Sequence, residues 1–267
     1  MHAFKYHRPS SVNDAATLAK GEAKLLAGGQ TLVQTMKLRL ASPSAIIDLG
    51  AIKDLAGIKS DGKTVTIGAM TRHADVAHSA EVKKAIPALA ALAGMIGDRQ
   101  VRAMGTIGGS LANNDPAADY PAAVLGLGAT VVTNKRKLSP DEFFKGMFTT
   151  ALGEGEIITA VSFPVPKRAA YTKFKNPASR FAIVGVFVAD FGTGGKDSAR
   201  VAVTGAGPGV FRQADMEKAL AAKFAPESVA GIRQKADGLN ADLHASAEYR
   251  AHLVTVMAKR AVAAAIK

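Results

Sequence analysis

Short apolar runs in the first part of the chain alternate with amphipathic stretches, a pattern that predicts strands connected by helices. We expect strands where an apolar run is too short for a helix, at residues 23–27, 45–49, 56–59, 64–69, 129–133 and 156–163. Helices are expected where apolar residues recur at helical spacing, at 12–20, 31–40, 74–78 and 81–95. Asp61-Gly62 is typical of a hairpin turn, and Pro87 predicts a kink or break in the last of these helices.

The last third of the chain has a different order. Apolar runs predict three strands, at 171–175, 181–191 and 200–205, and helices follow at about 213–223, 226–237 and 247–266. Pro164 and Pro166 disfavour both helix and strand pairing, so we place a domain boundary there. The expected class is α+β: a domain of residues 1–166, with two α/β subdomains at about 1–55 and 56–166, and a small domain of residues 167–267 that holds a three-stranded sheet with helices.

Small polar residues predict where several helices begin. Ser11, Thr71 and Ser246 each precede a helical stretch, and a hydroxyl oxygen at such a position accepts a hydrogen bond from a first-turn amide. Asp115-Pro116 predicts another helix start, because proline is tolerated at the first helical position. Residues 205–209 superficially resemble a dinucleotide fingerprint, but Pro208 removes one amide, so a turn is expected.

Composition narrows the function classes. The 267 residues are 48% hydrophobic and 21% charged, so a packed core is expected. There is no cysteine, which excludes disulfides, thiolate zinc sites, iron–sulfur clusters ligated by this chain and cysteine nucleophiles. The six histidines show no metal-ligand spacing.

The chain is basic: 34 Lys and Arg against 22 Asp and Glu give 34 − 22 = +12. Because these residues are scattered, aromatics are only 6% and tryptophan is absent, nucleic-acid binding is disfavoured. Basic charge also suits anionic ligands and acidic partner subunits. No apolar run approaches the roughly 20 residues that span a bilayer, and the N-terminus lacks a signal-peptide core. We therefore expect a protein with no transmembrane segment that is cytoplasmic unless a partner carries the export signal.

Two glycine-rich segments are the candidate chemistry. In the first, Gly28-Gly29 joins a strand to a helix N-terminus, where unpaired amides and the helix dipole suit a phosphate. In the second, Gly108-Gly109 is flanked by hydroxyl, Asn and Asp residues. Each pair taken alone is more often a plain turn. Two such segments could face one diphosphate from two sides, which makes a nucleotide with a bulky ring system plausible.

The motifs AGGQTLVQTMKLRL, TIGGSLANNDPAADYPA, EIITAVSFP, YTKF followed by FAIVGV, and SAEYRAHL resemble the FAD-binding medium subunit of molybdenum hydroxylases. That family includes the flavoprotein subunits of carbon monoxide dehydrogenase and xanthine dehydrogenase. The resemblance covers nearly the whole chain in the right order. It implies a flavin domain of the vanillyl-alcohol-oxidase type, made of two α/β subdomains, and a small C-terminal α+β domain.

The resemblance also implies site residues. The first segment would wrap the FAD diphosphate through Leu26, Ala27, Gly28, Gly29, Gln30, Thr31 and Leu32. The second would close the other side through Thr106, Ile107, Gly108, Gly109, Ser110 and Asn113. Asp119 would accept a hydrogen bond from the ribose, Ile158 would pack on the adenine, and Lys173 would approach the flavin ring. No residue is implied as catalytic or metal-binding.

Two departures from the family pattern stand out. Arg180 stands where many relatives have Asp, which puts the ring environment or the acceptor site in doubt. Some relatives carry an iron–sulfur cluster in this subunit, which a chain without cysteine does not.

The function implied is electron transfer within a heterotrimer, and the substrate is not named because its determinants lie on another chain. A large subunit would carry the molybdenum cofactor, a small subunit would carry two-iron–two-sulfur clusters, and this chain would pass electrons from those clusters through FAD to an external acceptor. A dimer of heterotrimers is expected. A free-standing flavin oxidoreductase and a basic binding protein without cofactor are the alternatives. Quinone, NAD, oxygen and a carrier protein all stay open as acceptors.

Overall fold

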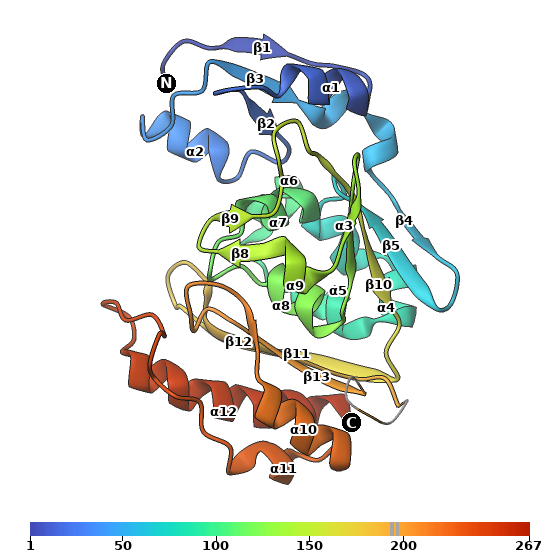
Figure 1. Ribbon diagram of the computed structural model, residues 1–267, viewed down its shortest axis with the longest axis vertical. Helices are drawn as coiled ribbons and strands as arrows, with labels where there is room; N and C mark the ends of the chain where they lie inside the picture. Colours follow the sequence, from blue (N-terminus) through green and yellow to red (C-terminus); the bar gives the residue numbers. More distant parts are fainter. Residues whose placement is uncertain (193–194, 196–197) are drawn as a thin grey trace.

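The computed structural model describes residues 1–192, 195 and 198–267. Three main sheets follow one another from the top to the bottom of Figure 1, each with its own helices. The N-terminal sheet is parallel, whereas the second and the C-terminal sheets are antiparallel.

The first sheet has the strand order β1-β3-β2. Its elements are β1 (Lys5–His7), α1 (Val12–Leu18), β2 (Lys24–Leu26), α2 (Leu32–Lys37), β3 (Ala45–Asp48) and two 3-10 turns, η1 (Leu49–Ala51) and η2 (Lys53–Leu55). Ser11 caps α1 as predicted, with its hydroxyl accepting from the Asp14 amide. Buried Ala15, Ile47 and Leu55 pack together beneath this sheet and against Ile157 of the next subdomain.

The second sheet has the strand order β4-β5-β10-β6-β7. Its strands are β4 (Ile58–Ser60), β5 (Thr64–Gly68), β6 (Thr130–Thr133), β7 (Lys137–Leu138) and β10 (Ile158–Pro164). The predicted hairpin at Asp61-Gly62 is confirmed, since β4 and β5 pair antiparallel around it. The central strand comes late in the chain: Val161 of β10 pairs with Ile67 on one side and Val131 on the other.

Helices lie around this second sheet, and all except the one at Arg99–Met104 contribute buried side chains to its core. They are α3 (His73–His78), α4 (Ala80–Ala85), α5 (Pro87–Gly94), α6 (Arg99–Met104), α7 (Ile107–Asn113), α8 (Tyr120–Gly126) and α9 (Pro140–Phe143). A small hairpin, β8 (Phe144–Gly146) with β9 (Thr149–Thr150), extends from α9. The break at Pro87 is confirmed: α4 ends before Ile86, and Pro87 opens α5.

Two predicted helix starts are wrong. Thr71 does not cap α3, because its hydroxyl is hydrogen-bonded to the backbone of Gly57, and Arg72 takes the cap position. Asp115-Pro116 does not open a helix. The Asp115 side chain accepts from the Ala117 amide and closes a turn between α7 and α8 instead.

The C-terminal sheet has the strand order β11-β12-β13-β14. Its elements are β11 (Arg168–Lys175), β12 (Ala182–Asp190), β13 (Ala199–Thr204), β14 (Phe211–Arg212), α10 (Ala214–Ala222), α11 (Pro226–Ala230) and α12 (Ala247–Ala265). The prediction of three strands missed the two-residue β14, which pairs with Val203 and Ala202. The predicted 226–237 helix is also wrong in length, because α11 ends before Gly231. Ser246 caps α12 through the Tyr249 amide.

The C-terminal sheet is covered on both faces, so every residue of β12 is buried. Figure 1 shows it between α5 and α8 above and α10 and α12 below. Phe187 and Ala189 join the core of the second subdomain, whereas Val184, Val186 and Val188 pack with α12. The shared strand therefore ties the two parts of the chain together through continuous apolar packing.

Two further predictions concern segments without a role in the site. Residues 205–209 form a bend in which Gly205 has φ +82°, a turn as expected. Among the described helices, none combines the length and hydropathy needed to cross a bilayer.

Candidate cofactor site

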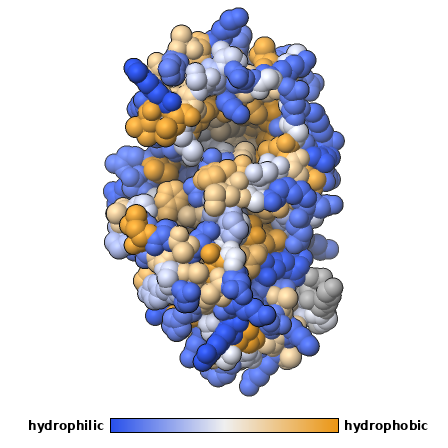
Figure 2. Space-filling model, turned by 60° about the vertical axis from the view of Figure 1, so that its left-hand side comes forward, coloured by the Kyte–Doolittle hydropathy of each residue, from blue (hydrophilic) through white to orange (hydrophobic). Residues whose placement is uncertain are grey.

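A cleft of about 760 Å³ separates the first sheet from the second subdomain and extends to the loop after β11. Figure 2 shows the recess beneath the N-terminal lobe, with apolar surface around it. Most of the residues predicted from sequence line this one cleft: Ala27, Gly28, Gly29, Gln30, Thr31, Leu32, Thr106, Gly108, Gly109, Ser110, Asn113, Asp119 and Ile158.

The first glycine segment presents unpaired backbone donors. Gly29 has φ +71°, which turns the chain sharply from β2 into α2. The Thr31 side chain makes no capping bond. Within the described residues, the first amide to find a helical partner is that of Val33, which donates to the Gly29 carbonyl. The amides of residues 28–32 are therefore available to an anionic ligand.

The second glycine segment is different, because its amides are already used. The Ile107 amide donates to the Thr71 carbonyl and that of Gly108 to the Ala69 carbonyl. The Gly109 amide donates to the Thr106 hydroxyl, which caps α7. This segment can therefore offer side-chain groups to a ligand and let the ligand approach its backbone closely. It does not offer a row of free amides.

The two segments touch. A Cβ built on Gly28 would lie 2.1 Å from the Met104 carbonyl oxygen, so only glycine permits this approach. A Cβ on Gly109 would lie 3.0 Å from the Thr106 hydroxyl and 3.5 Å from the Ala27 Cβ. Segments far apart in sequence thus form facing walls of one cleft.

Three predicted residues do not line the cleft: Leu26, Ile107 and Lys173. Leu26 ends β2, and Ile107 is buried in the core of the second subdomain. Lys173 lies behind Asp119: its Nζ donates to Asp119 Oδ2 at 2.9 Å and to the Met95 carbonyl at 3.0 Å. Its side chain is 2% exposed, so it is not a solvated strand lysine.

Asp119 is the link between this buried lysine and the cleft. The Tyr171 hydroxyl donates to its other carboxylate oxygen, so both oxygens have protein partners. Burial raises the pKa of Asp119, and the Lys173 ammonium opposes that rise. Burial also raises the pKa of Tyr171 well above its ordinary value, and the neighbouring Asp119 charge adds to that effect.

His73 lines the cleft and gave no signal in the sequence. A Cβ on Gly105 would lie 2.6 Å from its Nε2, so the ring packs directly under the second segment. Burial, and to a lesser extent Arg102, lowers the pKa of His73 to about 4. The ring is therefore neutral at physiological pH, and its position beneath Gly105 supports the cleft wall.

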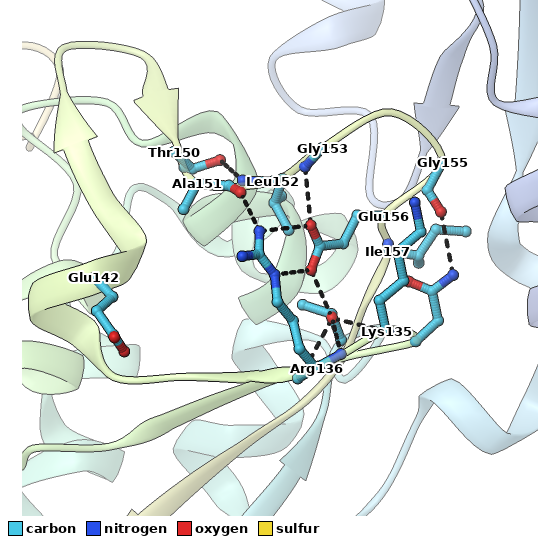
Figure 3. Close-up of polar contacts among 12 residues, drawn as sticks. Lys135, Arg136, Glu142, Thr150, Ala151, Leu152, Gly153, Gly155, Glu156 and Ile157 are labelled. Carbon is cyan, nitrogen blue, oxygen red and sulfur yellow. Dashed lines mark hydrogen bonds and ion pairs between the residues drawn. The ribbon is translucent and has the colours of Figure 1, made fainter.

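An ion pair fixes the strip of chain after β9, as Figure 3 shows. Arg136 Nε lies 2.9 Å from Glu156 Oε1, and Arg136 Nη2 lies 3.0 Å from Glu156 Oε2. Thr133 and the Gly153 amide also donate to this carboxylate. These bonds lower the pKa of Glu156 to about 2, with the hydrogen bond from Arg136 as the largest cause. Glu156 itself lines the cleft, so the pair holds one of its walls.

Further lining residues were not among the predicted cofactor contacts. They are Ile96, Gly97 and Asp98 before α6, Leu152 and Ile157 on the strip just described, and Ala178, Ser179, Arg180 and Phe181 after β11. Arg180 has φ +63° and is exposed. The position that departs from the family pattern is therefore at the cleft itself.

Two family models match this chain. FAD binding domain in molybdopterin dehydrogenase matches residues 2–166, and CO dehydrogenase flavoprotein C-terminal domain matches residues 169–265.

The chain belongs to the FAD-binding medium-subunit family of the molybdopterin dehydrogenases.

Curated relatives cover nearly the full chain. The carbon monoxide dehydrogenase medium chain of Hydrogenophaga pseudoflava is 36% identical over 98% of this chain and 96% of that protein. The nicotine 6-hydroxylase medium subunit of Paenarthrobacter nicotinovorans is 34% identical over 97% and 96%. Since one relative is named for carbon monoxide and the other for nicotine, membership of the family does not name a substrate.

A solved structure agrees. Carbon monoxide dehydrogenase from Hydrogenophaga pseudoflava, in a form that lacks the Mo-pyranopterin moiety, matches with a TM-score of 0.87 and 35% identity over 98% of this chain and 97% of that one. The predicted family, the α+β fold class and the assignment as a subunit of a molybdenum-containing oxidoreductase are confirmed.

The Arg136–Glu156 pair predicts an acid-sensitive component of stability. Because the folded pKa of Glu156 is depressed, its stabilisation is complete above about pH 4.5 and is lost as pH falls through about 2. Glu156→Gln should lower the free energy of unfolding by about 2 kcal/mol at pH 7, because solvent screens the half-exposed Arg136, and the gap from wild type should nearly close at pH 2. Urea denaturation of both proteins between pH 7 and pH 2 measures this difference in the free energy of unfolding.

The control for this prediction is Glu227→Gln, the same chemical change on an exposed glutamate of α11. Glu227→Gln should have the same free energy of unfolding as wild type at every pH. A gap between Glu156→Gln and wild type that stays constant from pH 7 to pH 2 would show that the ion pair is not the source.

Proposed function

We propose that this chain binds FAD in the cleft and serves as the electron-transfer subunit of a heterotrimeric molybdenum hydroxylase. In this proposal a large subunit carries the molybdenum cofactor and a small subunit carries two-iron–two-sulfur clusters. Electrons pass from those clusters through FAD to an external acceptor. Assembly as a dimer of heterotrimers, a cytoplasmic location and the division at residues 166 and 167 belong to the same proposal.

The residues of the cleft fit FAD. Its volume of about 760 Å³ lies in the range of about 300–1,000 Å³ typical of ligand and cofactor sites. Free amides at residues 28–32 suit the diphosphate, and Gly109 brings the second segment close to Ala27 of the first. Ile158 adds apolar surface for a ring. Bound FAD would supply the redox chemistry, and the protein supplies binding, orientation and electrostatics.

The observation that carries the proposal is the meeting of the two glycine segments at one cleft. Neither pair alone distinguishes a phosphate site from a turn. Their direct contact places free amides on one wall of the cleft and a capped helix start on the other, an arrangement that suits an anionic ligand. Asp119 closes the far part of the wall, held in place by Tyr171 and Lys173.

Lys173 acts on the site through Asp119 in this proposal. A carboxylate buried without a partner is costly, and the nearby ammonium compensates for that cost. The pair therefore keeps a charged acceptor at the cleft wall, available to a hydroxyl group of the cofactor. This replaces the predicted direct approach of Lys173 to the flavin ring.

The alternative is a free-standing flavin oxidoreductase with the same domains. It makes an opposite prediction for the native protein. Under our proposal, protein isolated from its source through a tag on this chain carries iron and molybdenum together with flavin, measured by metal analysis and absorbance. A flavin-loaded single chain that turns over a substrate without either metal would favour the alternative.

Gly109→Val tests the cleft directly. Its branched side chain would fill the gap between α7 and Ala27, so we expect FAD retention to fall by at least about tenfold. The ratio of flavin absorbance to protein measures the loss. Gly231→Val is the matched control, because a Cβ there meets nothing within 4 Å. Normal flavin content in Gly109→Val would remove the second segment from the site.

Lys173→Ala tests the buried pair. Removing one partner leaves Asp119 uncompensated and should cost about 3–5 kcal/mol of unfolding free energy. We expect FAD to be retained with a changed midpoint potential, measured by redox titration. Lys173→Met combined with Asp119→Asn removes both charges and should recover much of the stability. An unchanged potential in Lys173→Ala would show that the pair does not influence the flavin.

A further inference from the structure

Three turns beside the cofactor cleft each present an exposed apolar side chain. Phe148 lies between β8 and β9, Phe181 follows β11, and Leu243 precedes α12. They are 58%, 48% and 91% exposed. Figure 1 places the β8–β9 hairpin and the chain before α12 on the same side of the molecule.

A second hollow, of about 290 Å³, lies at these turns, and we call it the socket. Phe148 and Phe181 line it directly, together with His244, which follows Leu243 in the chain. The loop that carries Ser179 and Phe181 lines both the socket and the cofactor cleft. The socket and the cofactor cleft therefore share this loop, and Asp115, as a common wall.

The exposure of Phe148 is built into the fold. It has φ +52°, a left-handed conformation that is costly for a bulky residue. Asn114 holds the turn: its buried side-chain amide donates to the carbonyls of Gly146 and Thr149, and its backbone carbonyl accepts from the Phe148 amide. The structure thus uses a buried polar residue to keep an aromatic ring in solvent.

The other two turns are held in the same manner. Buried Asn176 accepts from the amides of Ala178 and Ser179, which shapes the turn that leads to Phe181. Asp242 accepts from the amide of His244, and its carboxylate pairs with the buried Arg250 at 2.7 Å. Single exposed apolar residues need no explanation, but three pinned turns around one hollow resemble the centre of a protein interface.

Charge indicates what kind of partner fits. Lys145, Lys175 and Arg180 are exposed on the same turns or next to them. Two carboxylates line the socket, and both have partners: Asp242 is paired with Arg250, and Asp115 accepts from the Ala117 amide. The chain as a whole carries +12. A second copy would bring like charges together, so an acidic surface is the complementary one.

We propose that the socket is the docking site for the electron-donating partner, a protein with an acidic contact face and a protruding apolar side chain that enters the hollow. The inference rests on the proposed function, since it assigns the direction from which electrons reach the cleft. The apolar side chains provide the buried anchor and the lysines and arginine form the charged border. Docking here brings the donor to the loop that also forms the cofactor wall.

The test uses the native assembly, isolated through a tag on this chain, with Leu243→Asp and Phe148→Asn as separate variants. Neither residue lines the cofactor cleft, and asparagine tolerates the left-handed conformation at position 148. We expect wild-type flavin per chain and a fall of about tenfold or more in co-purifying iron per flavin. Sedimentation should show loss of the partner, and added salt should weaken the wild-type assembly.

Ile266→Asp is the matched control. It introduces the same charge on an exposed apolar residue directly after α12, the far end of the helix from Leu243. It should keep the wild-type ratio of iron to flavin. Wild-type iron content in both socket variants would overturn this inference while leaving the FAD proposal intact. A self-association of this chain that the socket variants abolish would also overturn it. Wild-type protein without flavin would instead contradict the proposed function.

Discussion

The cleft depends on one close contact, the backbone of Gly28 against the backbone of Met104 and Gly105. Any side chain at position 28 would separate the first sheet from the second subdomain. Gly105 in turn lies on the ring of His73, so a second glycine allows the next layer to pack. Because Gly28 and Gly105 have no side chain, the free amides of residues 28–32 can lie opposite the capped start of α7. The walls that we assign to FAD follow from this approach of backbone to backbone.

Local chemistry explains what the sequence predicted well. Asp61-Gly62 and Pro87 dictate backbone conformation by themselves, so the hairpin and the helix break could be located without tertiary information. Thr71 and Asp115 failed for the same physical reason: their oxygens found other donors nearby, Gly57 for one and Ala117 for the other. A side chain that can cap a helix can equally close a turn, and only the folded chain decides between them.

The rest of the site depends on contacts between distant segments, which no local pattern encodes. Lys173 carries the motif position of a cofactor ligand, yet the fold places Asp119 in front of it. His73 lies in an ordinary amphipathic helix, and only the approach of Gly105 makes its ring part of the wall. The strip through Glu156 was predicted as a strand, but its anchoring by Arg136 required knowledge of the hairpin opposite.

The central position of β10 affects how the newly made polypeptide can mature. Ala160 pairs with Gly68, so the early strands must wait for much later residues to leave the ribosome. Until then, the apolar sides of α5 and α8 have neither a finished sheet on one side nor β12 on the other. The exposed apolar surface of such a nascent chain favours aggregation, which chaperones prevent. The cleft itself is completed late in synthesis, because the 178–181 loop that borders it is made last among its walls.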